Sequence, residues 1–153
     1  MKELLSNWLI VYIGNFIGSI LLSLLLYACG VIENNIELMN TFISIANKKV
    51  NYSFFALIIL GFLCNILVCT AVFLATNAKS TLEKIAVIII PIFLFIVLGF
   101  EHSVANMYYL SMAYIFGSFE ISELLITNLL PVTFGNILGG ILLSLYLYFT
   151  KRK

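Results

Sequence analysis

Four long apolar runs, separated by short polar stretches, dominate the pattern of hydrophobic and polar positions. They cover about residues 8–29, 53–75, 85–117 and 129–149. Each run is continuously apolar rather than alternating, so it predicts a helix and not a strand of a membrane barrel. A helix of about 20 apolar residues crosses the hydrocarbon core of a bilayer. The pattern therefore predicts four membrane spans in a single transmembrane domain, residues 1–153.

The third apolar run is too long for one plain helix and carries Gly99-Phe100-Glu101-His102-Ser103 at its centre. Pro91 removes an amide donor from the first half of the run, and Gly99 permits an unusual backbone just before the acidic residue. We therefore expect a broken helix around Gly99–Ser103. Broken helices at the bilayer midplane expose backbone groups towards substrate paths in transporters.

The pair at this break, Glu101 and His102, has two interpretations. Ionisable residues near the midplane are costly, and by default they indicate a functional site. An imidazole can donate or accept a hydrogen bond, and its charge responds to small changes in its surroundings. The pair can alternatively be a buried structural link between helices. Both can hold together, with Glu101 bracing the break while His102 faces a path.

An internal repeat relates the first and last apolar runs. Residues 7–24 align with residues 128–145, and the paired positions are 121 apart. The identities include Asn7/Asn128, Val11/Val132, Gly14/Gly135, Asn15/Asn136 and Gly18/Gly139. With four crossings the two copies run in opposite directions, as in the inverted repeats of transporters and channels. Two spans precede the second copy and none precedes the first, so we expect the equivalent of two spans to be missing.

Composition and charge agree with a membrane protein. The chain is 63% hydrophobic and only 10% charged, whereas soluble domains are about 25% charged. A net charge of +1 gives no basic field that would attract nucleic acid. If the N-terminus is cytoplasmic and the chain crosses the membrane four times, six of the eight basic residues lie on the cytoplasmic side. Cytoplasmic loops of membrane proteins are enriched in Lys and Arg, so this orientation, with a cytoplasmic C-terminus, is predicted.

Several kinds of chemistry find no support in the sequence. The three cysteines, Cys29, Cys64 and Cys69, fit buried thiols better than a disulfide framework or a metal site. The sequence shows no nucleophile with a base, no metal cluster and no phosphate-binding loop. We therefore expect neither an enzyme nor a cofactor.

The residues around the break resemble a known family. Gly-Phe-Glu-His-Ser-Val-Ala-Asn-Met at 99–107 is similar to the fifth-helix break of the formate/nitrite transporter family. Residues 61–69, 128–140 and 7–18 resemble its fourth, sixth and third helices. The resemblance covers essentially the whole chain, and the first two helices of the family have no counterpart. Thr70 stands where the family usually has an apolar residue.

The resemblance implies an all-α integral membrane protein with an aquaporin-like, inverted-repeat helical bundle. This bundle is incomplete, with one full three-helix repeat and the last helix of the other. The implied function is a homopentameric channel or transporter for small monovalent anions of weak acids. Formate, nitrite or hydrosulfide would cross a bacterial-type cytoplasmic membrane through one pore per subunit, often with proton coupling.

The resemblance also implies roles for particular residues. His102 matches the central pore histidine, and Lys49 matches a lysine near the extracellular vestibule. Asn65, Asn106 and Asn136 match polar residues around the pore of the family. Val68 and Phe95 match its apolar constriction residues. Structural support of the broken helix is expected from Gly99, Glu101 and Ser103. The hypothesis is that the lysine gathers the anion, the constriction removes its water, and the imidazole hydrogen-bonds it or supplies a proton.

Other interpretations stay open. A non-conducting membrane protein that pairs with another chain would agree with the missing spans. A channel for a neutral solute such as ammonia is disfavoured by the Glu-His-Ser-x-Ala-Asn-Met run. Taken alone, Lys49 also fits an interfacial anchor, and Asn65 and Asn136 also fit amides that hydrogen-bond across packed helices.

Overall fold

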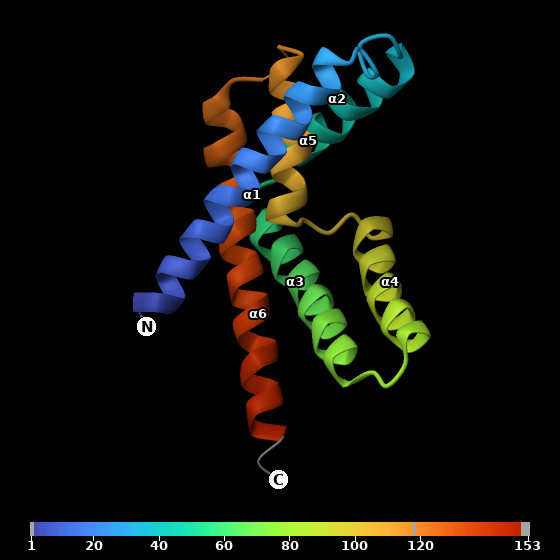
Figure 1. The fold of residues 1–153 in the computed structure, drawn as a ribbon. Helices are drawn as coiled ribbons and strands as arrows, with labels where there is room; N and C mark the ends of the chain where they lie inside the picture. The colour runs from blue at the N-terminus through green and yellow to red at the C-terminus, as the bar shows by residue number, and fades with distance from the viewer. Residues whose placement is uncertain (1, 118, 151–153) are drawn as a thin grey trace. The chain divides into compact units, whose positions relative to one another are not determined.

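The computed structural model describes residues 2–117 and 119–150, and all regular secondary structure in these ranges is helical. The elements are α1 (Lys2–Ala28), α2 (Ile36–Val50), α3 (Phe54–Asn77), α4 (Thr81–Val97), α5 (Ser103–Ile115), the π-helical η1 (Glu123–Leu129) and α6 (Leu130–Thr150) (Figure 1). The predicted all-α class is confirmed.

Within residues 2–117 and 119–150, three stretches are long and apolar enough to cross a bilayer: α1, α3 and the continuous Glu123–Thr150 stretch of η1 and α6. The third apolar run is divided between α4, of 17 residues, and α5, of 13 residues. The chain leaves the helical path between Val97 and Ser103, which confirms the predicted break. The basic residues 151–153, which enter the charge argument, lie outside the described residues.

The polar stretch between the first two spans contains a helix that the hydropathy pattern did not predict. This helix, α2, is amphipathic. The Asn35 side chain caps its N-terminus by accepting a hydrogen bond from the Leu38 amide at 3.0 Å. Lys48 and Lys49 occupy its last turn, where cations interact favourably with the carbonyl end of the helix dipole.

The helices form two compact units, which are described separately. The first unit contains α1, α2, η1 and α5 from Val104 onward. Its core consists of small and apolar side chains from α2, α5 and η1, against which two aromatic residues of α1 pack. These residues are Ala46, Met107, Leu110, Ala113, Leu124 and Leu129, with Tyr12 and Phe16 from α1.

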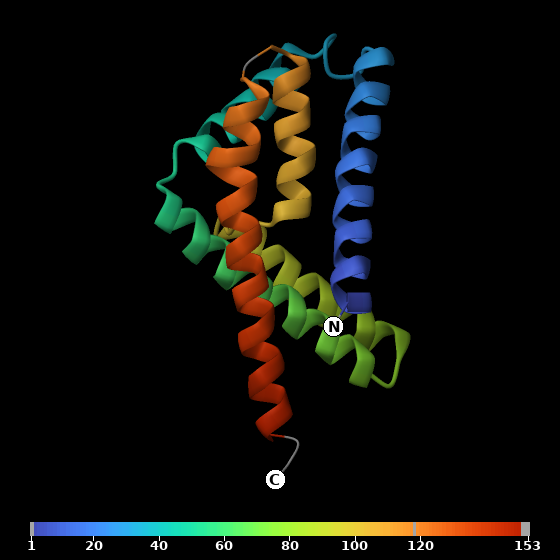
Figure 2. The same cartoon turned by 90° about the vertical axis from the view of Figure 1, so that its left-hand side faces the viewer.

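The second unit contains α3, α4, the break and α6. Helix α3 packs against α6, lying beside it in Figure 1 and crossing behind it in Figure 2, and α4 packs on α3. A Cβ atom added to Gly135 would overlap the carbonyl oxygen of Ile58, and one added to Gly139 would overlap that of Phe62. These glycines therefore allow the two backbones to approach closely.

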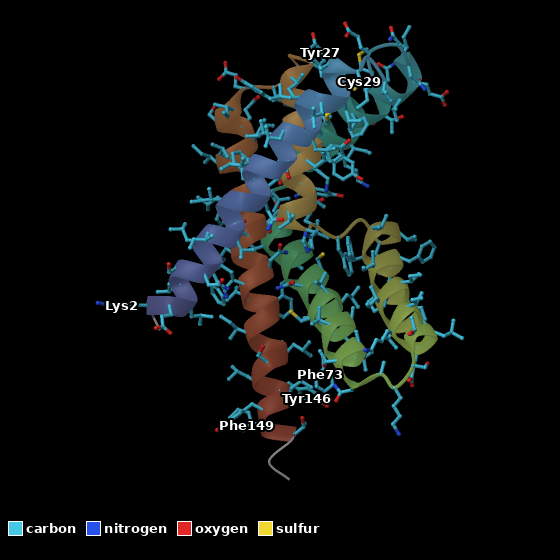
Figure 3. All side chains as sticks on the ribbon, viewed as in Figure 1. Lys2, Tyr27, Cys29, Phe73, Tyr146 and Phe149 are labelled. Carbon is cyan, nitrogen blue, oxygen red and sulfur yellow. The ribbon has the colours of Figure 1, made fainter. Side chains whose placement is uncertain are left out.

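The three cysteines are free thiols with different exposures. Cys64 is buried in α3 and Cys69 is partly buried, whereas Cys29, just after the end of α1 (Figure 3), is exposed. The prediction of buried thiols therefore holds for Cys64 and is wrong for Cys29. The reason is that Cys29 follows the last turn of the apolar helix, where the chain turns at Gly30 with a φ of 66°.

Candidate site at the broken helix

Backbone hydrogen bonds end α4 in a defined way. The amide of Gly99 donates to the carbonyl of Ile96 at 3.1 Å, and the amide of Phe100 donates to the carbonyl of Phe95 at 2.9 Å. This pair of bonds is the Schellman motif, which requires a left-handed residue after the helix. Gly99 supplies it with a φ of 67°. The position of the break is therefore encoded locally.

A single amide side chain holds the chain on both sides of His102. The Nδ2 group of Asn136 donates to the carbonyl of Glu101 at 2.9 Å, and its Oδ1 accepts from the amide of Ser103, also at 2.9 Å. Nδ2 also donates to the carbonyl of Gly61 at 2.8 Å. Because these bonds are buried, the Asn136 side chain satisfies two backbone groups at the break, the Glu101 carbonyl and the Ser103 amide, and adds a bond to the Gly61 carbonyl within α3.

Further contacts fix this arrangement to α3. The Nδ2 group of Asn65 donates to the backbone carbonyl of Asn136, which ties α3 to α6 next to the break. The amide of Glu101 points to the carbonyl of Leu60 at 3.4 Å. Glu101 is buried, with 2% of its surface exposed. The backbone of the break is thus held by α3 and α6 together.

The imidazole of His102 is positioned by its neighbours. The ring is partly buried and stacks on Phe95, with ring centroids 5.9 Å apart and 23° between the planes. Phe95 belongs to the last turn of α4, so the Schellman end of that helix sets where its ring lies. The second unit therefore brings together seven predicted site residues: Asn65, Phe95, Gly99, Glu101, His102, Ser103 and Asn136.

Val68, the other predicted constriction residue, lies on α3 of the same unit. It lines an apolar groove of about 440 Å³ between α3 and α4, together with Ala71, Val72 and Ile88 among others. Val68 is therefore on the side of α3 that faces α4. Phe95 contacts His102 instead, so the structure assigns these two apolar residues to different surroundings.

Lys49 and Asn106 belong to the first unit. The Nδ2 group of Asn106 donates to Oδ1 of Asn128 at 2.8 Å, and Nδ2 of Asn128 donates to the carbonyl of Lys49 at 2.9 Å. Both asparagines are buried. The ammonium group of Lys49 lies 5.7 Å from the centroid of the Tyr109 ring, within cation–π range. These two hydrogen bonds link α5, η1 and the end of α2.

Asn128 was not among the predicted site residues. The sequence does carry a signal for it, because Asn128 is one of the residues shared with the first copy of the repeat, as Asn7. Its role depends on contacts with residues 22 and 79 positions away, which a single sequence does not reveal. Among the described residues, no group of three or more His, Cys or Glu side chains is arranged to hold a metal ion.

These features define a class. An apolar helical chain whose third apolar run breaks around a histidine, with the break held by a buried amide from a neighbouring span, is a multi-pass membrane protein of the channel and transporter type.

The family described as formate/nitrite transporter matches residues 1–150, and the chain belongs to this family. The chain is 34% identical to the formate channel FocA of Haemophilus influenzae over 90% of its length and 56% of the relative. It is 37% identical to the uncharacterised transporter YrhG of Bacillus subtilis over 97% of its length and 56% of the relative. The chain thus spans about half the length of these relatives.

Among solved structures, the chain is similar to a pentameric formate channel with formate bound. The TM-score is 0.86 and the sequence identity 32%, over 99% of this chain and 68% of that one. These relatives bear the names of channels and transporters rather than of enzymes.

Proposed function

We propose that the protein is a channel or transporter that carries formate and similar small weak-acid anions, such as nitrite and hydrosulfide, across the cytoplasmic membrane. The formate-bound pentameric channel, which resembles the chain over nearly its whole length, supports this substrate and a homopentameric assembly. The distribution of basic residues supports a cytoplasmic C-terminus.

In this proposal Lys49 attracts the anion. Its position is defined, because Asn128 holds its backbone carbonyl and Tyr109 lies beside its ammonium group. A cation at the entrance raises the local concentration of a small anion and speeds its entry. Asn106 acts indirectly, through its hydrogen bond to Asn128.

The apolar residues Val68 and Phe95 then restrict the hydration of the permeating species. A bare anion pays a large free-energy cost when it leaves water for apolar surroundings. The same loss of water raises the pKa of a weak acid, so protonation becomes easier where the path is narrow. The neutral acid can therefore pass a constriction that excludes its anion.

His102 is the group that receives the substrate. The observation that carries this role is the clamp formed by Asn136, which bonds the residues on both sides of His102 while Phe95 stacks on the ring. A held imidazole can donate a hydrogen bond to an anion or transfer a proton to it. Glu101 is assigned to structural support, since a carboxylate lining the path would repel an anion.

The test is flux in liposomes. The purified protein is reconstituted, and uptake of labelled formate is compared with uptake by protein-free liposomes, with nitrite, hydrosulfide and ammonia measured in parallel. The proposal predicts uptake of formate above the protein-free level, with ammonia at that level. Formate uptake no faster than in protein-free liposomes would contradict it, and uptake of ammonia alone would favour a neutral-solute channel.

A further inference from the structure

An aromatic cluster lies beside the ammonium group of Lys49 in the first unit. Three partly buried rings make up this cluster, the aromatic triad, which is formed by Phe42 of α2 and by Tyr108 and Tyr109 of α5 (Figure 1). The ring centroid of Phe42 lies 5.6 Å from that of Tyr108 and 5.9 Å from that of Tyr109, and the two tyrosine centroids lie 5.7 Å apart. Because every ring contacts the other two, in the edge-on and tilted geometries that aromatic pairs favour, the rings hold one another in place.

Helix geometry brings Lys49 to the triad. Phe42 and Lys49 are seven residues apart in α2, which is about two turns, so both side chains lie on one face of the helix. Long side chains in a helix point back towards its N-terminus, so the lysine stem extends from the last turn of α2 towards Phe42. Its ammonium group reaches the face of the Tyr109 ring, where Nζ lies 5.7 Å from the centroid.

One side of α5 fixes both ends of this lysine. Its backbone carbonyl accepts from Asn128, which in turn accepts from Asn106 of α5, and its ammonium group lies over the ring of Tyr109. Asn106 and Tyr109 are three residues apart in α5, so they are neighbours on the helix surface. The same helix thus holds the lysine backbone through two amides and the charged end through a ring.

A ring differs from a carboxylate as a partner for a lysine that must attract anions. A carboxylate would neutralise the ammonium charge and would itself repel an arriving anion. An aromatic ring has no net charge, and it attracts a cation through the negative face of its quadrupole. An ammonium group carries three N–H donors, so it can rest on a ring and still donate a hydrogen bond to an anion. The Tyr109 ring therefore holds the lysine without neutralising it.

We propose that Tyr109 is a positioning residue for anion entry. The face of its ring, fixed by Phe42 and Tyr108, keeps the Lys49 ammonium in one place and leaves the positive charge available to a permeating anion. The ring face does this work, and the phenol hydroxyl does not. The inference rests on the proposed function, in which Lys49 attracts the anion, and it adds the residue and the type of contact that prepare the lysine for that role.

The role of Tyr109 predicts a separation between KM and kcat. Without the ring contact, Lys49 keeps its charge, but its long side chain samples more rotamers before an anion arrives. Ordering that side chain then costs free energy when the anion binds. The KM of uptake should therefore rise, whereas kcat, which depends on later steps of permeation, should stay the same.

The first experiment measures formate uptake in liposomes with phenylalanines of increasing fluorination at position 109. Fluorine changes the size of the ring little but withdraws electron density from its face, so it weakens a cation–π contact stepwise. Tyr109→Phe should keep the KM, and three fluorines should raise it by about fivefold, which corresponds to about 1 kcal/mol. The control is the same series at Phe116, whose ring packs edge-on against Tyr27 in the same unit, with centroids 6.0 Å apart. Fluorination there should leave the KM unchanged.

The second experiment observes the lysine directly and needs no transport. Reductive methylation with ¹³C-formaldehyde labels the lysines and keeps their positive charge, and a methyl group over a ring face resonates upfield in the NMR spectrum. The Lys49 signal should lie upfield of that of the exposed neighbour Lys48, stay there in Tyr109→Phe, and move towards the Lys48 position in Tyr109→Leu.

Three results would each overturn the proposal: an unmoved Lys49 signal in Tyr109→Leu, a KM that does not follow the number of fluorines at position 109, or a KM that rises in Tyr109→Phe. Absence of formate uptake by the unsubstituted protein would instead contradict the proposed function. In that case the NMR signal still decides whether Tyr109 holds the lysine.

Discussion

The buried amide of Asn136 gives a quantitative prediction. Asn136→Ala removes three hydrogen bonds, to the carbonyls of Gly61 and Glu101 and from the amide of Ser103. Each buried bond contributes about 1 kcal/mol net, so the free energy of unfolding should fall by about 3 kcal/mol. The matched variant Asn15→Ala removes one exposed bond within α1 and should change it by less than about 0.5 kcal/mol.

Thermal unfolding in detergent measures the difference. For a chain of this length, 1 kcal/mol corresponds to about 2–4 °C, so Asn136→Ala should lower the Tm by about 6–12 °C. Asn15→Ala should lie within about 2 °C of the unsubstituted protein. Similar Tm values for the two variants would refute the assignment of the clamp to Asn136.

Hydrogen exchange locates the effect. The amide of Ser103 is bonded to Asn136 and should exchange faster in Asn136→Ala. The amide of Leu38, which is capped by Asn35 in α2, serves as the internal reference and should keep its rate. Unchanged exchange across residues 99–105 would show that other contacts hold the break.

Three further predictions concern packing, lysine positioning and thiol exposure. Gly139→Ala should lower the free energy of unfolding by about 1–3 kcal/mol because its Cβ overlaps the α3 backbone, whereas Gly18→Ala should leave the Tm equal or higher. Asn128→Ala removes the hydrogen bond to the Lys49 carbonyl at the end of α2, so Lys49 is held less firmly. This variant should raise the KM of formate uptake in liposomes more than it lowers kcat. An unchanged KM would remove Asn128 from the entrance. Maleimide should label Cys29 in the folded protein much faster than Cys64, and equal rates would contradict the burial of Cys64 within α3.

The break could be predicted because its determinants are local. Gly99 supplies the left-handed residue that ends α4, and the apolar run around it is too long for one helix. The amphipathic helix α2 could also have been predicted from the sequence. Typical helix-boundary residues occur at its start, Asn35 and Glu37, and at its end, Lys48. The pattern of long apolar runs did not reveal them because the stretch is polar.

The clamp itself could not be derived from the sequence. The repeat singled out Asn136, but its partners Gly61 and Ser103 lie 75 and 33 residues away, and only folding brings them together. The same holds for Asn128, whose partner Lys49 is 79 residues away. Sequence patterns identify residues that need a partner in an apolar environment, whereas the three-dimensional fold decides which partner they receive.

The central claim is that His102, held at the break, meets the permeating acid. The most direct test is formate uptake into liposomes as a function of external pH, for the unsubstituted protein and for His102→Asn, which removes the titrating group but keeps a side chain that can hydrogen-bond. The account predicts uptake that rises with an inward proton gradient in the unsubstituted protein and loses this dependence in the variant. Uptake by His102→Asn that follows pH as the unsubstituted protein does would contradict it.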